Sequence, residues 1–171
     1  IYGSRLYQIL ESLATSGAFD PEIVPVQEPA TGNGSYSESL LGPASLLPPL
    51  AFLYRDSLQE LRHHARSLAS RWGADTTRSA VTEFFADLVW NALNAKPPST
   101  VIDAAGAPAA DPAVQATVSA IVEHEGNLRE ALSAAESSPR SVHPTAPHGM
   151  IVGMVLGAFH GPEAIPEEWM S

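Results

Sequence analysis

The apolar residues of this chain recur every three or four positions, and this spacing limits what the chain can fold into. No segment of useful length alternates apolar and polar residues with β-branched enrichment, so the sequence offers no candidate strand. The helical spacing appears in five segments, which are 6–17, 58–73, 81–96, 111–132 and 147–160. We therefore predict an all-α fold, a compact bundle of helices forming one domain over residues 1–171.

Proline and glycine mark where these helices begin and end. Segments rich in Pro, Gly, Ser and Ala lie at 25–43, 97–112 and 137–149, and we expect them to be loops. The clearest helix start is Asp111, a typical N-cap residue, followed by Pro112 at the first helical position. The apolar stripe that follows predicts one continuous helix through Val114, Val118, Ile121, Val122, Leu128 and Leu132.

Charge and cysteine content exclude several classes of function. Nineteen acidic residues against nine basic ones give a net charge of −10, which argues against nucleic acid or an anionic membrane surface as a partner. The chain has no cysteine, so disulfides, thiolate nucleophiles and cysteine-bound metals are excluded, and an intracellular, reducing compartment is expected. The longest apolar stretch, 150–159, is much shorter than the roughly 20 residues of a membrane span.

The last predicted helix carries the most specific pattern, a glycine at every fourth position. Each glycine lowers helix propensity by about 1 kcal/mol relative to alanine, so the repeat calls for a structural reason. We predict that these glycines line a core face where another helix packs closely, and the alternative is the approach of a ligand. The four residues are Gly149, Gly153, Gly157 and Gly161.

The segment GMIVGMVLGAFHGPEAIPEEWM (149–170) resembles the C-terminal helix of the ADP-ribosylglycohydrolases, in which small residues precede Gly, Ala-Ile-Pro and a Trp. Residues 7–24, YQILESLATSGAFDPEIV, are similar to an early helix of that family, and residues 48–61 to a Pro-Leu segment before an acidic helix. The resemblance covers nearly the whole chain but lacks the family's first several dozen residues. It implies an all-α fold with a cleft that holds two magnesium ions.

The first metal motif of the family precedes the early helix and corresponds here to Ile1, Tyr2 and Gly3. A family variant with Tyr-Gly-Asp-Gln would align Tyr2 and Gly3 and place Ser4 at its Asp. Residues 1–10 contain no carboxylate, so both alignments leave this motif without an acidic ligand.

The second metal motif of the family precedes the C-terminal helix and corresponds to Pro144, Thr145 and Ala146. No Asp or Glu occurs between Glu136 and Glu163. Without carboxylates in either motif, nothing would hold two divalent cations close together, so we expect no metal and no magnesium cofactor despite the resemblance.

A glycine-rich loop of the family corresponds to Gly32, Asn33 and Gly34, which are the candidate cleft-binding residues for ADP-ribose. The arginine that follows this loop in the family is replaced here by Leu46. The ligand-contacting loop therefore only partly matches the family.

Histidines offer a second set of candidates. His143 and His148 flank the second motif and His160 follows on the same helix, so they represent either a transition-metal site or solvated loop histidines, and we favour the latter. Adjacent His63 and His64 point about 100° apart on a helix and are predicted to be a boundary pair with one side chain half-buried. Around His124, the acidic residues 123 and 125 are expected to form a solvated face.

These observations favour a catalytically inactive relative of the ADP-ribosylglycohydrolases that acts as a structural or interaction subunit with a protein partner. Jellyfish eye-lens crystallins are similar proteins with a bulk structural use. One alternative is a metal-independent module that binds ADP-ribose or a related nucleotide. A third is a magnesium-dependent hydrolase of ADP-ribosyl linkages whose acidic ligands come from outside this chain.

Overall fold

The computed structural model describes residues 40–71, 76–106, 108, 111–137 and 146–169. Within these ranges the chain forms α-helices and short 3-10 helices and no strand, which confirms the all-α prediction. The predicted first helix (6–17) lies outside the described residues. The described α-helices are α2 (Leu47–Leu53), α3 (Leu58–Arg71), α4 (Thr76–Leu93), α5 (Pro98–Ala105), α6 (Pro112–Glu123), α7 (Leu128–Ser137) and α8 (Ala146–His160).

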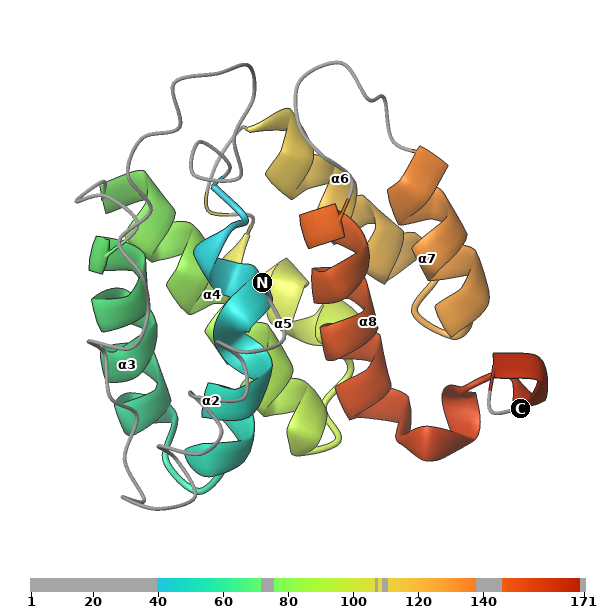
Figure 1. Ribbon diagram of the computed structural model, residues 1–171, viewed down its shortest axis with the longest axis horizontal. Coiled ribbons are helices and arrows are strands. Elements are labelled where there is room, and N and C mark those ends of the chain that lie inside the picture. The colour runs from blue at the N-terminus through green and yellow to red at the C-terminus, as the bar shows by residue number, and fades with distance from the viewer. Residues whose placement is uncertain (1–39, 72–75, 107, 109–110, 138–145, 170–171) are drawn as a thin grey trace, which may run out of the picture.

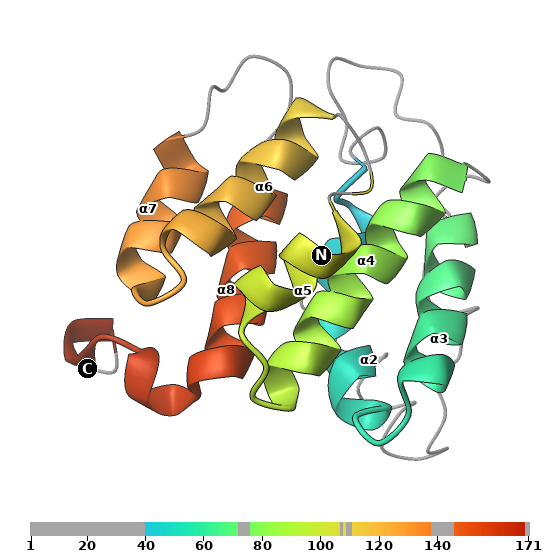
Figure 2. The same ribbon diagram turned by 180° about the vertical axis from the view of Figure 1, so that it is seen from behind.

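Helix α8 lies across the middle of the bundle. Figure 1 shows α2, α3 and α4 on one side of it and α6 and α7 on the other, and in Figure 2, which is seen from behind, α5 lies in front of it. The helix packs against α4, α6 and α7 and against the 3-10 helix η2 (Pro43–Leu46). Its place in the bundle suits its composition, because His148 is the only ionisable residue between Ala146 and Phe159.

One continuous hydrophobic core joins these helices. Its largest fully buried side chains come from η2 and its flanks, α2, α3, α4, α6 and α8, so no helix pair has a separate core. They are Leu41, Leu47, Leu50, Leu61, Leu68, Val81, Phe85, Leu88, Val89, Ile121, Ile151 and Leu156. None of the described helices is long and apolar enough to cross a bilayer.

Side-chain caps fix several helix starts that the sequence marks. Asp111 accepts hydrogen bonds from the backbone N–H groups of Ala113 and Val114 at 2.9 and 3.1 Å, so the predicted N-cap of α6 is confirmed. The Ser57 hydroxyl accepts from the N–H of Glu60 at 3.3 Å at the start of α3. These caps satisfy backbone donors that a helix start otherwise leaves without partners.

Two expectations about 97–132 are wrong. The predicted loop at 97–112 contains α5, which begins after Pro97, buries Ile102 and ends at Gly106, where φ is +69°. The predicted single helix over 111–132 is two helices, because the chain turns between α6 and α7 and Asn127 caps α7 by accepting the N–H of Glu130 at 3.2 Å. Val122, expected on the buried stripe, lies in the last turn of α6 and is 37% exposed.

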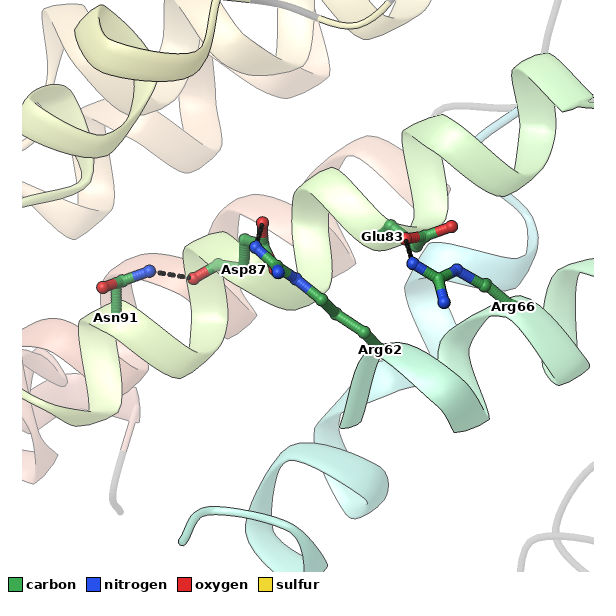
Figure 3. Close-up of polar contacts among 5 residues, drawn as sticks. All are labelled: Arg62, Arg66, Glu83, Asp87 and Asn91. Carbon is green, nitrogen blue, oxygen red and sulfur yellow. Dashed lines mark hydrogen bonds and ion pairs between the residues drawn. The ribbon is translucent and has the colours of Figure 1, made fainter. Parts of the chain in front are cut away.

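Two arginines of α3 set the alignment of α3 on α4 (Figure 3). Arg62 donates two hydrogen bonds to Asp87, from Nε to Oδ1 and from Nη2 to Oδ2, each 2.7 Å. One turn further, Nη2 of Arg66 lies 2.7 Å from Oε2 of Glu83. The hydrogen bonds to Asp87 are the main cause that raises the pKa of Arg62. Both pairs lie at the rim of the bundle, so they contribute more to register than to stability.

Candidate functional site

The family resemblance places the candidate site at the N-terminal end of α8. Ala146 is the first residue of that helix, so the position of the second metal motif adjoins its first turn. Pro144 and Thr145 lie outside the described residues, as do the first-motif positions Ile1, Tyr2, Gly3 and Ser4 and the loop Gly32, Asn33 and Gly34. Of the candidate site, the structure therefore describes only the N-terminal end of α8.

The first turn of α8 is built into the core. Pro147 and His148 are buried, and Nδ1 of His148 lies 2.9 Å from the hydroxyl oxygen of Thr117 on α6. Thr117 already donates its hydroxyl proton to the carbonyl oxygen of Ala113 at 2.8 Å, so His148 must be the donor to Thr117 through Nδ1–H. A buried polar pair thus joins α6 to α8 where the family resemblance implies a metal site.

The prediction of solvated loop histidines is wrong for His148 and His160. His148 follows the same helical stripe as the buried residues Ile151, Val152 and Val155, which places it in the interior. His160, in the last turn of α8, is half-buried and donates through Nε2 to the carbonyl oxygen of Glu125 at 2.5 Å. His143 lies outside the described residues.

The residues present at this helix end do not fit magnesium. Ala146, Pro147 and His148 supply no carboxylate, and oxygen ligands with negative charge are what this cation prefers. A transition-metal site shared by His148 and His160 is also excluded, because twelve residues of helix separate them by about 18 Å. Within the part of the chain that the structure describes, no three His, Asp or Glu residues are grouped to hold a metal ion.

Among the described residues, the glycines of α8 predicted to form a close-packed core face make few contacts. Gly149, Gly153 and Gly157 are half-buried, and each follows a buried residue, turned about 100° away from it around the helix axis. A Cβ added at Gly149 or Gly157 would meet no described atom within 4 Å, and one at Gly153 would lie 3.7 Å from Cδ2 of Leu132. Among the described helices, only α7 comes within ordinary contact distance of this glycine face, at Gly153.

Gly161 has a different reason to be glycine. It follows the last residue of α8 with φ of +75° and ψ of −169°, a backbone conformation that is essentially confined to glycine. Its N–H donates to the carbonyl oxygen of Gly157 at 2.9 Å and so closes the last turn of the helix. The residue ends α8 and turns the chain, and does not contribute to a packing face.

The acidic pair around His124 is only partly a solvated face. Glu123 is exposed as expected, and His124 lies 3.5 Å through Nδ1 from Oε2 of Glu130. Glu125 is different, because its Oε2 accepts the backbone N–H of Ser99 at 3.0 Å at the start of α5. Together with the hydrogen bond from His160, this contact makes Glu125 the point where α5, α8 and the α6–α7 turn meet.

The prediction for the adjacent histidines is confirmed. His63 is exposed, and His64 is half-buried with its ring stacked on Tyr54 at a centroid distance of 4.3 Å. Burial is the main cause that lowers the pKa of His64, and the nearby His63 adds to it. This pair belongs to the α2–α3 corner and lies apart from the candidate site.

A hollow of about 280 Å³ that no sequence pattern predicts lies at the other end of α8. It separates the first turn of α7 from the chain that follows α8. Because the two walls are more than thirty residues apart in sequence, no local pattern could reveal the hollow. Its lining residues are Gly126, Asn127, Leu128, His160, Glu163 and Ala164.

Comparison with known proteins agrees with the resemblance read from the sequence. No significant match was found among curated protein sequences or among solved structures. A family model described as ADP-ribosylglycohydrolase matches residues 45–171, about three quarters of the chain. The matched region includes every described α-helix, from α2 to α8. The chain therefore belongs to the ADP-ribosylglycohydrolase family.

Proposed function

We propose that this chain is a non-catalytic member of its family that serves as a structural or interaction subunit. The observation that carries the proposal is the composition of the two metal-motif positions. Ile1 to Ser4 and Pro144 to Ala146 contain no carboxylate, and the nearest acidic residues to the second position are Glu136 and Glu163. Two magnesium ions close together need such ligands to offset their mutual repulsion.

The local packing supports the same proposal. His148, which directly follows the second motif position and Pro147, is buried and uses its Nδ1–H to bind Thr117. A side chain held in this way stabilises the contact between α6 and α8. In our proposal the helix end that a metal-dependent relative would use for chemistry serves the packing of the bundle.

Magnesium binding is the first test. An intact site at 100 times its dissociation constant would stabilise the fold by about 2.7 kcal/mol, which for a domain of this size corresponds to roughly 5–10 °C in melting temperature. We expect no shift beyond that of a salt control at equal ionic strength. A magnesium-specific shift of several degrees would contradict the proposal and favour acidic ligands supplied from elsewhere.

Turnover and ligand binding separate the remaining candidates. We expect no release of ADP-ribose from a modified arginine or serine substrate in magnesium, and release abolished by a chelator would identify a hydrolase. In titration calorimetry with ADP-ribose we expect little or no heat, because the ligand is anionic and the chain carries a net charge of −10. Binding at low micromolar strength would favour the metal-independent binder instead.

A further inference from the structure

The chain beyond α8 forms a short segment that we call the strap, residues 162–169. After the turn at Gly161 it contains the 3-10 helices η3 (Pro162–Ala164) and η4 (Glu167–Trp169). Both ribbon views show it projecting from the end of α8 beyond the bundle (Figures 1 and 2). The strap therefore presents side chains outside the core.

Arg129, in the first turn of α7, fastens the end of the strap. Its guanidinium pairs with the carboxylate of Glu168 and lies 5.8 Å from the ring centroid of Trp169. The cation over the ring is a favourable arrangement that orients the indole. Even so, Trp169 is 50% exposed and Ile165, on the same strap, is 39% exposed.

A half-exposed tryptophan that is held beside an arginine is suited to contact a partner. Trp and Arg are the residues most enriched among those that dominate binding energy at protein interfaces. Because Arg129 already holds the indole in place, Trp169 would lose little further conformational freedom when a partner contacts it. The hollow next to the strap adds a recess into which a partner side chain can enter.

The negative charge around this surface favours a positively charged partner. Glu163 lines the hollow and Glu167 follows on the strap, which has no basic residue of its own, while the charge of Glu168 is offset by Arg129. Residues 97–171 contain nine Asp and Glu against two basic residues, whereas residues 40–96 contain five against six. The negative charge is thus concentrated in the part of the chain that carries the strap.

We infer that the strap and the first turn of α7 form a docking surface for a basic segment of a partner protein. A cationic side chain of the segment enters the hollow beside Glu163, and an apolar side chain covers Trp169. The inference deepens the proposed function, on which it rests, by giving the interaction subunit a site and its partner a chemistry. The surface lies at the opposite end of α8 from the second metal-motif position, about 20 Å away along the helix.

A synthetic peptide tests the inference with the full chain. The probe is a 14-residue helical peptide of Arg and Leu, and its controls replace Arg by Glu or Leu by Ser. We expect calorimetric binding of the Arg–Leu peptide alone, weakened at least tenfold by Trp169→Ala and severalfold by Glu163→Gln. Phe52→Ala and Glu60→Gln are matched controls, because Phe52 is 67% exposed and Glu60 is exposed on α3, away from the strap.

The possible results separate this inference from the proposed function. Equal weakening by Trp169→Ala and Phe52→Ala, or none by either, would overturn the docking surface and leave the prediction of inactivity intact. Magnesium-dependent turnover with unchanged peptide binding would overturn the proposed function alone. Binding of anionic vesicles or single-stranded DNA that requires Trp169 would contradict the charge argument. Melting temperatures of the variants within about 2 °C of the parent show that the comparison is between folded proteins.

Discussion

Replacing Gly157 by alanine tests directly whether the glycine face of α8 is open. Glycine within a helix is destabilising by roughly 0.5–1 kcal/mol relative to alanine, and a Cβ at this position would meet no described atom within 4 Å. The substitution should therefore increase the free energy of unfolding by about that amount. For a chain of this length the expected rise in melting temperature is about 1–4 °C.

The effect can be enlarged by changing two glycines together. Gly149 and Gly157 are eight residues apart, about 12 Å along the helix, so their effects should add. The double alanine variant is expected to melt roughly 2–8 °C higher than the parent in calorimetry or circular dichroism.

Gly161→Ala is the matched control, and we expect it to lower the free energy of unfolding where Gly157→Ala raises it. Its φ of +75° disfavours any side chain, and an added Cβ would lie 3.0 Å from Oε2 of Glu163. We expect a loss of about 1–3 kcal/mol for this variant. If Gly157→Ala instead lowered the melting temperature, a backbone would have to pack against this face, and the close-packing hypothesis read from the sequence would be restored.

Three further variants test other contacts. Thr117→Val should cost about 1–3 kcal/mol in chemical denaturation, because it leaves the buried N–H of His148 without an acceptor; an unchanged midpoint would show that the pair does not stabilise the fold. Arg62→Ala should cost up to about 1 kcal/mol, less in high salt, since the pair with Asp87 is partly exposed; a salt-independent loss would contradict an electrostatic origin. The lowered pKa of His64 means that the unfolded state binds more protons, so stability should fall as the pH drops through about 6.5, and this slope should be smaller in His64→Phe; equal slopes would refute the assignment.

The helix boundaries marked by proline, glycine and capping residues were readable from the sequence. Asp111 with Pro112 marks the start of α6, and α8 begins within one residue of the predicted position. Such signals are reliable because they act within one helical turn. By contrast, the sequence predicts a loop where α5 lies, because this eight-residue helix buries only Pro98 and Ile102 and has no apolar stripe.

The errors on α8 have one physical cause, which is that its apolar surface extends almost all round. A helix of this kind gives no direct indication of which side is buried. The buried side is marked by His148, Ile151, Val152, Val155 and Leu156 at spacings of three and four residues, whereas the glycines are half-buried among the described residues. Continuing the stripe back to His148 would have predicted its burial, whereas its acceptor on α6 could not be found without the fold.

The contacts of the strap lie beyond any sequence pattern. Arg129 and Trp169 are forty residues apart, and neither residue belongs to a local motif that names the other. Their contact depends on the turn at Gly161, which directs the chain from the end of α8 towards the first turn of α7. The family resemblance extends to Trp169 and so indicates that the strap belongs to the fold. It does not indicate which residues the strap contacts.

The composition of the motif positions also bears on stability. A cluster of carboxylates that binds two cations repels itself when the cations leave, so a fold with such a cluster depends on metal for part of its stability. Pro144, Thr145 and Ala146 carry no charge, and the neighbouring His148 is held inside the core by Thr117. A chain with these residues has no such repulsion at that helix end and needs no cation to relieve it. In the function we propose, this helix end keeps its shape without a bound cation, and the subunit presents a surface to its partner.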